Sequence, residues 1–269
     1  MSFKHRMVKI QLFRQLVWGL FALSLLTFSL GISWQVSKVN NFFYGVWYQV
    51  LDIHQVVDKS VPRNTQGKHD FPIDDIKLHQ EKFADIVTAI HHHGVGLADI
   101  TYINKQFKLR KLLTTSEVEH LQDVANLLDN INRFWLGNLF VLLALALFYC
   151  QQLKVLTIEK GQSLTVNSSR VMPTTKQKAL TVLILLLAVL VLLASVGFTK
   201  VFYYLHTVVF PLDHQWFFYY KDSLMATLMK APDIFAAIAL QLLSFALVIA
   251  VVIDTVISRY QRNLNVQSA

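Results

Sequence analysis

The sequence predicts a mainly α-helical integral membrane protein with four transmembrane helices and a large extracytoplasmic α(+β) cap between the first and second spans. Hydrophobic residues make up 54% of the 269 residues and charged residues only 16%, which is typical of membrane proteins. Four apolar runs are long enough to cross a hydrocarbon layer of about 30 Å, which takes roughly 20 helical residues. Basic residues are also concentrated on one side of these runs.

The four predicted spans comprise residues 15–34, 134–153, 179–198 and 235–257. The first span follows a basic start, as the apolar part of a signal peptide would. Its apolar part is too long for a signal peptide, however, and it lacks a cleavage site of the small-x-small type. We therefore interpret it as a retained membrane anchor.

The distribution of charge predicts the topology. Residues 1–14, 154–178 and 258–269 contain 11 basic residues and one acidic residue, so they account for the whole positive excess of a chain whose net charge is +8. The segment 35–133 has 11 basic and 12 acidic residues, and the segment 199–234 has three of each. Because Lys and Arg near span ends stay on the cytoplasmic side, both termini are expected inside and the two balanced segments outside. The basic charge is thus a topology signal, and no nucleic-acid partner is inferred from it.

A single cysteine, Cys150, rules out an intramolecular disulfide. It falls at the inner end of the second predicted span, so it is not available as a nucleophile for chemistry on the outer face. A packing role is expected.

The first outer segment begins with a stretch rich in aromatic and β-branched residues, 40–56. This composition indicates either one or two strands or an interfacial aromatic layer. A loop at 59–70 is followed by Pro72 and two aspartates, which predict the first turn of a helix that ends at Gly94. Residues 94–113 then resemble a short extended ribbon.

Three consecutive histidines, His91, His92 and His93, close the predicted helix. Adjacent helical residues point about 100° apart, so the three cannot all bind one ion, and a helix C-terminus favours cationic side chains without any metal. The common zinc spacings are absent, and we expect no metal and no cofactor. A metal site that combines one of them with His54, His69 or His79 is the alternative.

The stretch TTSEVEHLQDVANLL, residues 114–128, is the centre of the functional prediction. Thr114 followed by Glu117 is a capping-box pattern, which predicts that a helix begins here. Glu117, His120 and Asp123 are three residues apart and share one helix surface, so either carboxylate can orient His120 and raise its basicity. This arrangement suits a general base. The alternative is a solvated amphipathic helix with an incidental histidine.

The helix that carries His120 leads into the second predicted span at Phe134. A straight helix would place His120 roughly 21 Å above the hydrocarbon, at 1.5 Å per residue. We therefore expect a bend at residues 130–133, which would let the helix lean along the membrane surface.

The second outer segment, 199–234, begins as an aromatic belt of the kind found at membrane interfaces. His206, Asp213, His214 and Asp222 lie among these aromatic residues. Polar groups in such surroundings are costly unless they have a function. For His214, a third polar contact and a purely interfacial position are both open.

Two motifs in this chain resemble those of the lipoprotein intramolecular transacylases, which are four-span bacterial membrane proteins. The first, E-x-x-H-M-x-D-V, is matched from Glu117 to Val124, with Leu121 in place of Met. The second pairs a histidine with aromatic residues and two aspartates. It is matched by His206, Phe210, Asp213, Trp216, Phe218 and Asp222. Leu205 stands where a Phe is usual, Ser116 where an Arg is common, and the Asp-to-Trp spacing is one residue longer. The resemblance covers nearly the whole chain.

The resemblance implies an enzyme that moves the sn-2 acyl chain of a diacylglyceryl lipoprotein to the α-amine of its N-terminal cysteine. His120 is then expected as the base and His206 as the acid or oxyanion-side donor, or the reverse. Expected supporting residues are Glu117, Asp123, Asp213 and Asp222, and expected substrate-binding residues are Phe210, Trp216 and Phe218. The implied partners are diacylglyceryl-modified lipoproteins and bilayer lipid, in the bacterial cytoplasmic (inner) membrane with the active site on the outer face.

Two other classes remain as alternatives. One is a non-enzymatic membrane protein with an external histidine-rich domain that senses metal or pH. The other is a different membrane enzyme that acts on a phospholipid ester with the same two histidines. A Ser-His-Asp hydrolase is not expected, because no G-x-S-x-G motif is present.

Overall fold

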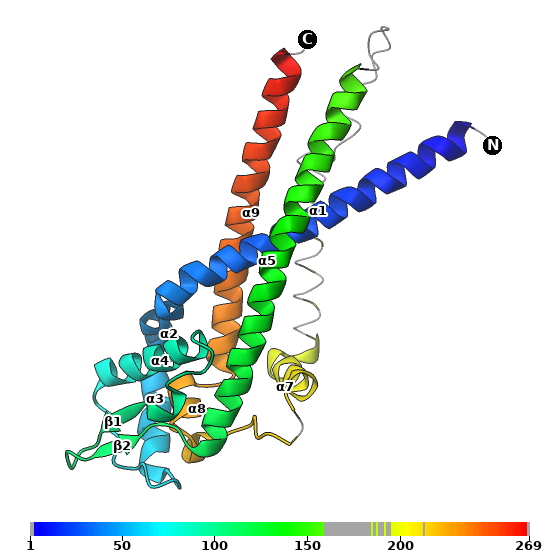
Figure 1. The fold of residues 1–269 in the computed structure, drawn as a ribbon. Helices are drawn as coiled ribbons and strands as arrows, with labels where there is room; N and C mark the ends of the chain where they lie inside the picture. Colours follow the sequence, from blue (N-terminus) through cyan, green and yellow to red (C-terminus); the bar gives the residue numbers. More distant parts are fainter. Residues whose placement is uncertain are drawn as a thin grey trace. The chain divides into compact units, whose positions relative to one another are not determined.

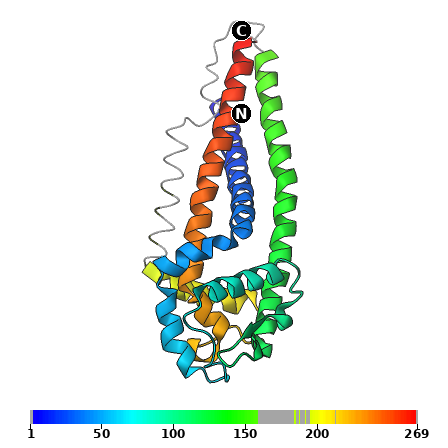
Figure 2. The same cartoon turned by 90° about the vertical axis from the view of Figure 1, so that its left-hand side faces the viewer.

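The computed structural model describes residues 3–158, 184, 187, 191, 195–211 and 213–267. These residues form a mainly helical protein, shown in two views in Figures 1 and 2. The chain divides into two compact units. Unit 1 comprises Met1–Ser33, Phe134–Ser195 and Ser244–Ala269, and unit 2 comprises Trp34–Arg133 and Val196–Leu243.

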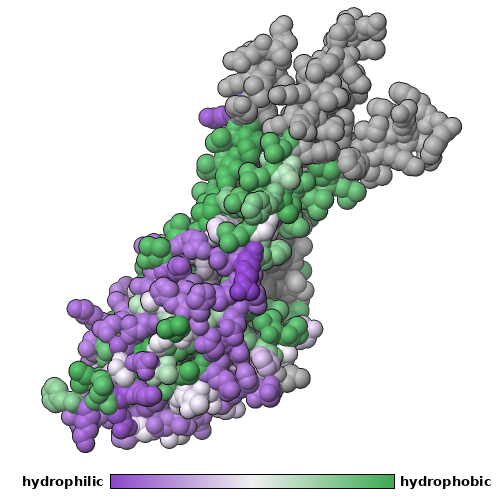
Figure 3. Space-filling model, in the orientation of Figure 1, coloured by the Kyte–Doolittle hydropathy of each residue, from purple (hydrophilic) through white to green (hydrophobic). Residues whose placement is uncertain are grey.

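Unit 1 is built from the apolar parts of three long helices, which are α1 (Phe3–Val39), α5 (Thr115–Ile158) and α9 (Asp233–Gln267). In the described part of the chain, three helical stretches are long and apolar enough to cross a membrane. They are Leu16–Val39, Thr115–Leu147 and Asp233–Ile257. Figure 3 shows hydrophobic residues over the described surface of the unit 1 helices. The predicted loop at 154–178 and the third predicted span lie mostly outside the described residues.

Polar and small side chains join α1 and α5 within unit 1. The Ser24 hydroxyl donates to Asn138 Oδ1 at 2.8 Å, and Asn138 Nδ2 donates to the Ser24 carbonyl at 2.9 Å. Gly31 lies against the indole of Trp135, and a Cβ at this glycine would overlap that ring. Such small and polar contacts are what brings helices close together inside a bilayer.

Near its start, unit 2 forms helices in residues 40–56, for which the sequence allowed either strands or an interfacial aromatic layer. After a 3-10 turn at Asn41–Phe43 come α2 (Tyr44–Val50) and α3 (Ile53–Ser60), so the strand interpretation was wrong. Tyr44, Tyr48, Ile53 and Val57 are all buried, at a spacing close to one helical turn. β-propensity is a weak preference, and burial of this helical face overrides it.

The elements between α3 and α5 agree with the sequence. Helix α4 (Ile76–Ile90) follows Asp75, whose side chain accepts a hydrogen bond from the Leu78 amide at 2.9 Å. After Gly94, which has a positive φ of 80°, a short 3-10 turn covers Leu97–Asp99. The predicted ribbon is an antiparallel hairpin of β1 (Thr101–Ile103) and β2 (Leu109–Lys111). A second 3-10 turn covers Val61–Arg63.

Helix α5 begins as the capping box predicts. The Glu117 amide donates to Thr114 Oγ1 at 3.3 Å, and Glu117 Oε2 accepts from the Thr114 amide at 2.5 Å. The helix then continues without interruption through residues 130–133, so no break is present where we expected a bend. None of these residues is Pro or Gly, and helices rarely kink without one of these residues or an inserted group.

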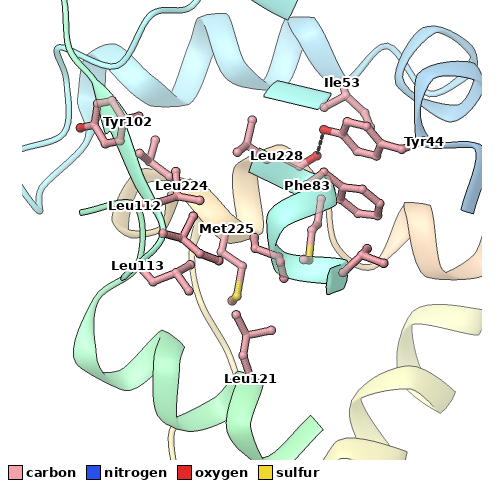
Figure 4. Close-up of a cluster of buried hydrophobic side chains, with 14 of the residues drawn as sticks. Tyr44, Ile53, Phe83, Tyr102, Leu112, Leu113, Leu121, Leu224, Met225 and Leu228 are labelled. Carbon is pink, nitrogen blue, oxygen red and sulfur yellow. Dashed lines mark hydrogen bonds between the residues drawn. The ribbon is translucent and has the colours of Figure 1, made fainter. Parts of the chain in front are cut away.

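The core of unit 2 surrounds the short helix α8 (Leu224–Met229), all six residues of which are buried. Figure 4 shows this cluster, in which Leu224, Met225 and Leu228 of α8 lie among side chains from α2, α4, β1 and the start of α5. The Tyr44 hydroxyl donates to the Leu228 carbonyl at 2.6 Å. The segment 199–234 therefore supplies the centre of the core through α8. The same part of the chain also contains α7 (Phe198–Val209) and a 3-10 turn at Tyr220–Asp222.

Candidate active site

The structure brings the two predicted catalytic histidines together. His120 lies near the start of α5, and His206 lies on α7, 86 residues later in the sequence. Their ring centroids are 6.1 Å apart with an interplanar angle of 33°. His120 is only 7% exposed, whereas His206 is half-buried. Two imidazoles at this separation can act on one small group between them.

Aromatic side chains surround this histidine pair, which is defined here as His120 and His206. The Phe210 ring lies 5.0 Å from the His120 ring and 5.1 Å from the His206 ring, measured between centroids. Phe218 lies 5.9 Å from His120, and Trp216 lies 5.4 Å from His206. All three aromatic residues that we expected to bind substrate therefore contact the pair. They provide an apolar wall beside two polar rings.

A backbone hydrogen bond orients His206. Its Nδ1 lies 2.8 Å from the carbonyl oxygen of Phe202, one helical turn earlier. A carbonyl oxygen only accepts, so Nδ1 carries the hydrogen and the neutral ring has its lone pair on Nε2. Burial lowers the pKa of His206, although the hydrogen bond to Phe202 opposes this shift. Near neutral pH, His206 is therefore an uncharged base with a defined acceptor atom.

His120 has a polar atom without a partner. Its Nδ1 is buried and has no hydrogen bond within the described part of the chain. Buried polar atoms are nearly always satisfied, so an exception marks a place where a substrate group can bond. The His206 ring lies nearby, and two adjacent imidazoles resist carrying two positive charges at once.

Glu117 does not bond to His120. Its side chain is fully buried, and it accepts hydrogen bonds from the Thr114 amide and from the Ser223 hydroxyl. Lys68 Nζ lies 3.9 Å from Glu117 Oε2 and also donates to the Leu112 carbonyl at 2.6 Å. Burial lowers the pKa of Lys68, and the charge of Glu117 partly offsets this. Glu117 thus stabilises the start of α5, and a direct role beside His120 stays a prediction.

Beyond the capping box with Thr114, the sequence contains no local signal for the partners of Glu117. Lys68 lies in the loop after α3, 49 residues before it, and Ser223 lies 106 residues after it. The Ser223 hydroxyl also accepts from the Ala226 amide at 2.8 Å and so caps α8. This buried cluster of Lys68, Glu117 and Ser223 connects the loop, the start of α5 and the core helix.

Asp123 bonds to His214 and not to His120. Its Oδ2 lies 2.6 Å from His214 Nδ1, and Glu119 Oε1 lies 3.5 Å from His214 Nε2. His214 therefore contacts two carboxylates of α5. Asp123 interacts with His120 only through the electrostatic effect of its negative charge, because no hydrogen bond joins the two side chains.

The remaining predicted supporting residues lie apart from the histidine pair. Asp213 is exposed, and its charge acts on His214. Asp222 Oδ1 accepts from the Thr65 hydroxyl at 2.5 Å, and the Thr65 amide donates to the Lys221 carbonyl at 2.9 Å. These bonds attach the second outer segment to the loop after α3. Roles for Asp213 and Asp222 in catalysis stay predictions.

Three of the other histidines, His79, His91 and His93, bond to groups outside the histidine pair. His79 is fully buried, with its Nε2 donating to the Pro72 carbonyl at 2.8 Å and its Nδ1 2.8 Å from the Tyr48 hydroxyl. Both ring nitrogens are thus occupied, and His79 has no lone pair left for a metal. His91 accepts from Trp34 Nε1 at 3.1 Å, and His93 pairs with Asp129 at 2.7 Å. Among the described residues, no three His, Cys, Asp or Glu side chains are grouped closely enough to hold a metal ion.

Comparison with known proteins identifies a family that the chain matches. The family model "Lipoprotein intramolecular transacylase Lit" matches residues 18–231, which is well over half of the chain. A search of curated proteins found no significant match. Among solved structures, the fold is similar to the in meso structure of the membrane integral lipoprotein intramolecular transacylase Lit from Bacillus cereus, in a variant with one histidine replaced by arginine. The TM-score is 0.59 at 15% identity, and the match covers 100% of both chains.

Proposed function

The chain belongs to the lipoprotein intramolecular transacylase family, a family of membrane acyltransferases, and on this premise we propose the reaction that it catalyses. The enzyme moves the sn-2 acyl chain of a diacylglyceryl lipoprotein to the α-amine of the N-terminal cysteine of the same lipoprotein. The product is a lyso-form lipoprotein with an amide-linked acyl chain. The observation that carries this proposal is the pair of imidazoles at 6.1 Å within an aromatic enclosure.

The chemistry requires a base. An α-amine has an unperturbed pKa near 7.7 to 8.0, so it is mostly protonated at neutral pH and has no lone pair to attack an ester. The amine and the ester belong to one molecule, so no enzyme nucleophile is needed and the two reacting groups are already linked. The enzyme has to orient them, move protons and stabilise the negative charge that forms on the carbonyl oxygen.

We assign the base to His206 and the donor to His120, which reverses the first of the two assignments that the sequence allowed. The lone pair of His206 is on Nε2, and burial keeps the ring neutral. Nε2 takes a proton as the amine nitrogen attacks the ester carbonyl carbon. The C–O bond to glycerol then breaks, and the glyceryl oxygen takes a proton from the imidazole pair, which restores the starting protonation state. His120 donates a hydrogen bond to the oxyanion.

The aromatic residues have a binding role in this proposal. Phe210 and Phe218 contact His120, and Trp216 contacts His206, so an acyl chain that lies against them has its ester beside both imidazoles. Apolar contacts of this kind hold lipid chains without hydrogen bonds. We further propose that the site faces outward from the bacterial cytoplasmic membrane, with both termini in the cytoplasm, because the excess of basic residues lies in residues 1–14, 154–178 and 258–269.

Mass spectrometry of lipoprotein N-termini tests the proposed function directly. Purified enzyme in lipid is incubated with a diacylglyceryl lipopeptide whose two acyl chains differ in mass. We expect the sn-2 chain to appear on the amine with no change in total mass. Unchanged lipopeptide would rule out the transacylation and favour a sensing protein, whereas acyl transfer from added phospholipid would indicate the phospholipid-directed alternative.

The pH dependence of kcat/KM has an expected form. Below about pH 8 the substrate amine becomes protonated, so log kcat/KM falls with a slope of one. The second loss, from protonation of the base, begins only below pH 6.5, because burial lowers the pKa of His206 below its ordinary value. Rates measured from pH 4.5 to 9 should therefore steepen to a slope of two below pH 6.5. Steepening above pH 6.5 would contradict His206 as the base.

A further inference from the structure

Residues 211–219, which follow Phe210 at the C-terminal end of α7 and lead to the 3-10 turn at Tyr220–Asp222, carry two of the three aromatic residues of the site. The described residues of this segment, 211 and 213–219, contain no helix or strand. Trp216 lies against His206 and Phe218 lies against His120. The ladders of regular secondary structure do not fix this segment, so its position depends on side-chain contacts.

His214 provides a direct side-chain connection from this segment to α5. Its Nδ1 lies 2.6 Å from Asp123 Oδ2, and the Asp123 side chain is only 15% exposed. Asp123 lies three residues after His120, so it is on the same helix face and about one turn away. The bond therefore joins the helix that carries one reactive imidazole to the segment that carries the aromatic wall.

We propose that His214 is a positioning residue for the acyl transfer: its bond to Asp123 holds Trp216 and Phe218 against the His120–His206 pair. The inference rests on the proposed function only for its kinetic consequence. The mechanical part concerns the order of residues 213–219 and does not depend on which reaction occurs. His214 has no contact with the two reactive rings, so it acts on them only through the segment.

The charges around His214 give this bond a pH dependence. Three carboxylates face its ring, Asp123 and Glu119 from α5 and Asp213 from its own segment. The hydrogen bond to Asp123 is the main cause that raises the pKa of His214, and the three negative charges add to it. A group with a raised pKa contributes its charged interaction below that pKa and loses it as the pH rises through it. The bond is therefore stronger below the raised pKa of His214 than above it.

Two variants separate the hydrogen bond from the side chain. His214→Ala removes the donor, and His214→Asn keeps an amide donor close to the Nδ1 position but cannot titrate. With the purified enzyme in lipid and a diacylglyceryl lipopeptide, we expect His214→Ala to lower kcat/KM roughly tenfold or more, since hydrogen bonds to charged groups are stronger than neutral ones. We expect His214→Asn to recover most of this loss. The loss should include an increase in KM, because the aromatic wall binds substrate.

Hydrogen exchange of the backbone amides gives a readout that does not depend on catalysis. In the unmodified enzyme, exchange in residues 213–219, corrected for the intrinsic effect of pH, should increase as the pH rises through the raised pKa of His214. His214→Ala should show the fast exchange at every pH, and His214→Asn should show slow exchange with no such step. Asp123→Asn, which removes the charge from the other side of the bond, should abolish the step as well.

The outcomes distinguish this inference from the proposed function. Unaltered exchange and unaltered kcat/KM in His214→Ala would overturn the positioning role. A His214→Asn variant as impaired as His214→Ala would also overturn it, because the ring and not the bond would then matter. If the enzyme transfers no acyl chain but exchange changes as described, the proposed function fails while the mechanical link stands. Should His214→Ala not fold, His214→Asn and Asp123→Asn alone decide the question through the exchange step.

Discussion

Replacing His120 or His206 by alanine is expected to lower the rate of acyl transfer by roughly 10²- to 10⁴-fold, the usual contribution of a positioned proton-transfer group. Both rings lie beside the position that we assign to the ester, and no other imidazole contacts either of them in the described part of the chain. The measurement is the initial rate of amide formation with a lipopeptide substrate. The amount of folded enzyme is quantified by size-exclusion chromatography.

The double variant gives a sharper test. If the two imidazoles act on one proton-transfer step, removing the second should cost little once the first is absent, because groups that act as a unit have non-additive effects. The matched control is His92→Gln, which alters an exposed histidine of the same unit and should leave the rate unchanged. Additive losses would indicate that the histidines serve separate steps, and a single variant with the unaltered rate would exclude that residue from the chemistry.

Glu117→Ala is expected to destabilise the fold of unit 2 by about 3–5 kcal/mol, the typical cost of removing one partner of a buried ion pair. Glu117 is fully buried, and Lys68, which is 7% exposed, lies 3.9 Å from its carboxylate. The substitution would also leave the Ser223 hydroxyl and the Thr114 amide without their acceptor. Thermal unfolding in detergent should show a lower midpoint and a loss of folded yield.

Two controls show whether the buried charge is the cause. Glu81→Ala removes an exposed carboxylate that lies 2.9 Å from the buried Lys82, and it should cost no more than about 1 kcal/mol because Glu81 is in contact with water and Lys82 keeps its pair with Asp85 at 2.7 Å. The double substitution Glu117→Gln with Lys68→Met removes both charges and keeps an acceptor for Ser223, so it should recover much of the stability. Glu117→Ala with the same unfolding midpoint as Glu81→Ala would contradict the proposed role of the buried cluster.

Several elements follow from local sequence alone. The capping box at Thr114 and Glu117 predicted the start of α5, because its bonds join groups only three residues apart. The two aspartates after Pro72 predicted a helix nearby, although Asp75 is the N-cap of α4 and not part of its first turn. The apolar runs predicted the long helices, since hydropathy and length are properties of contiguous residues. His120 and His206 were identified from their motifs, and their resemblance to a family supplied the reason to consider them together.

Other features were decided by tertiary contacts. The aromatic stretch that begins at Asn40 forms helices because their buried face packs into the core, and local propensity did not reveal this. The burial of α8 depends on residues far away in the sequence, and two partners of Glu117, Lys68 and Ser223, lie 49 and 106 positions from it. Asp123 shares a helix face with His120, yet it bonds to His214, which is 91 residues away.

The sequence by itself determined that this is a helical membrane protein and where helix α5 begins, and it pointed to two histidines as candidates for the chemistry. Only the tertiary structure decided which groups surround those histidines and which carboxylate bonds to which partner. The physical reason is the range of the interactions. Caps, apolar runs and helix faces arise within a few residues, whereas a hydrogen bond or ion pair forms with the group that the folded chain places nearest, and sequence spacing along one helix does not specify that group.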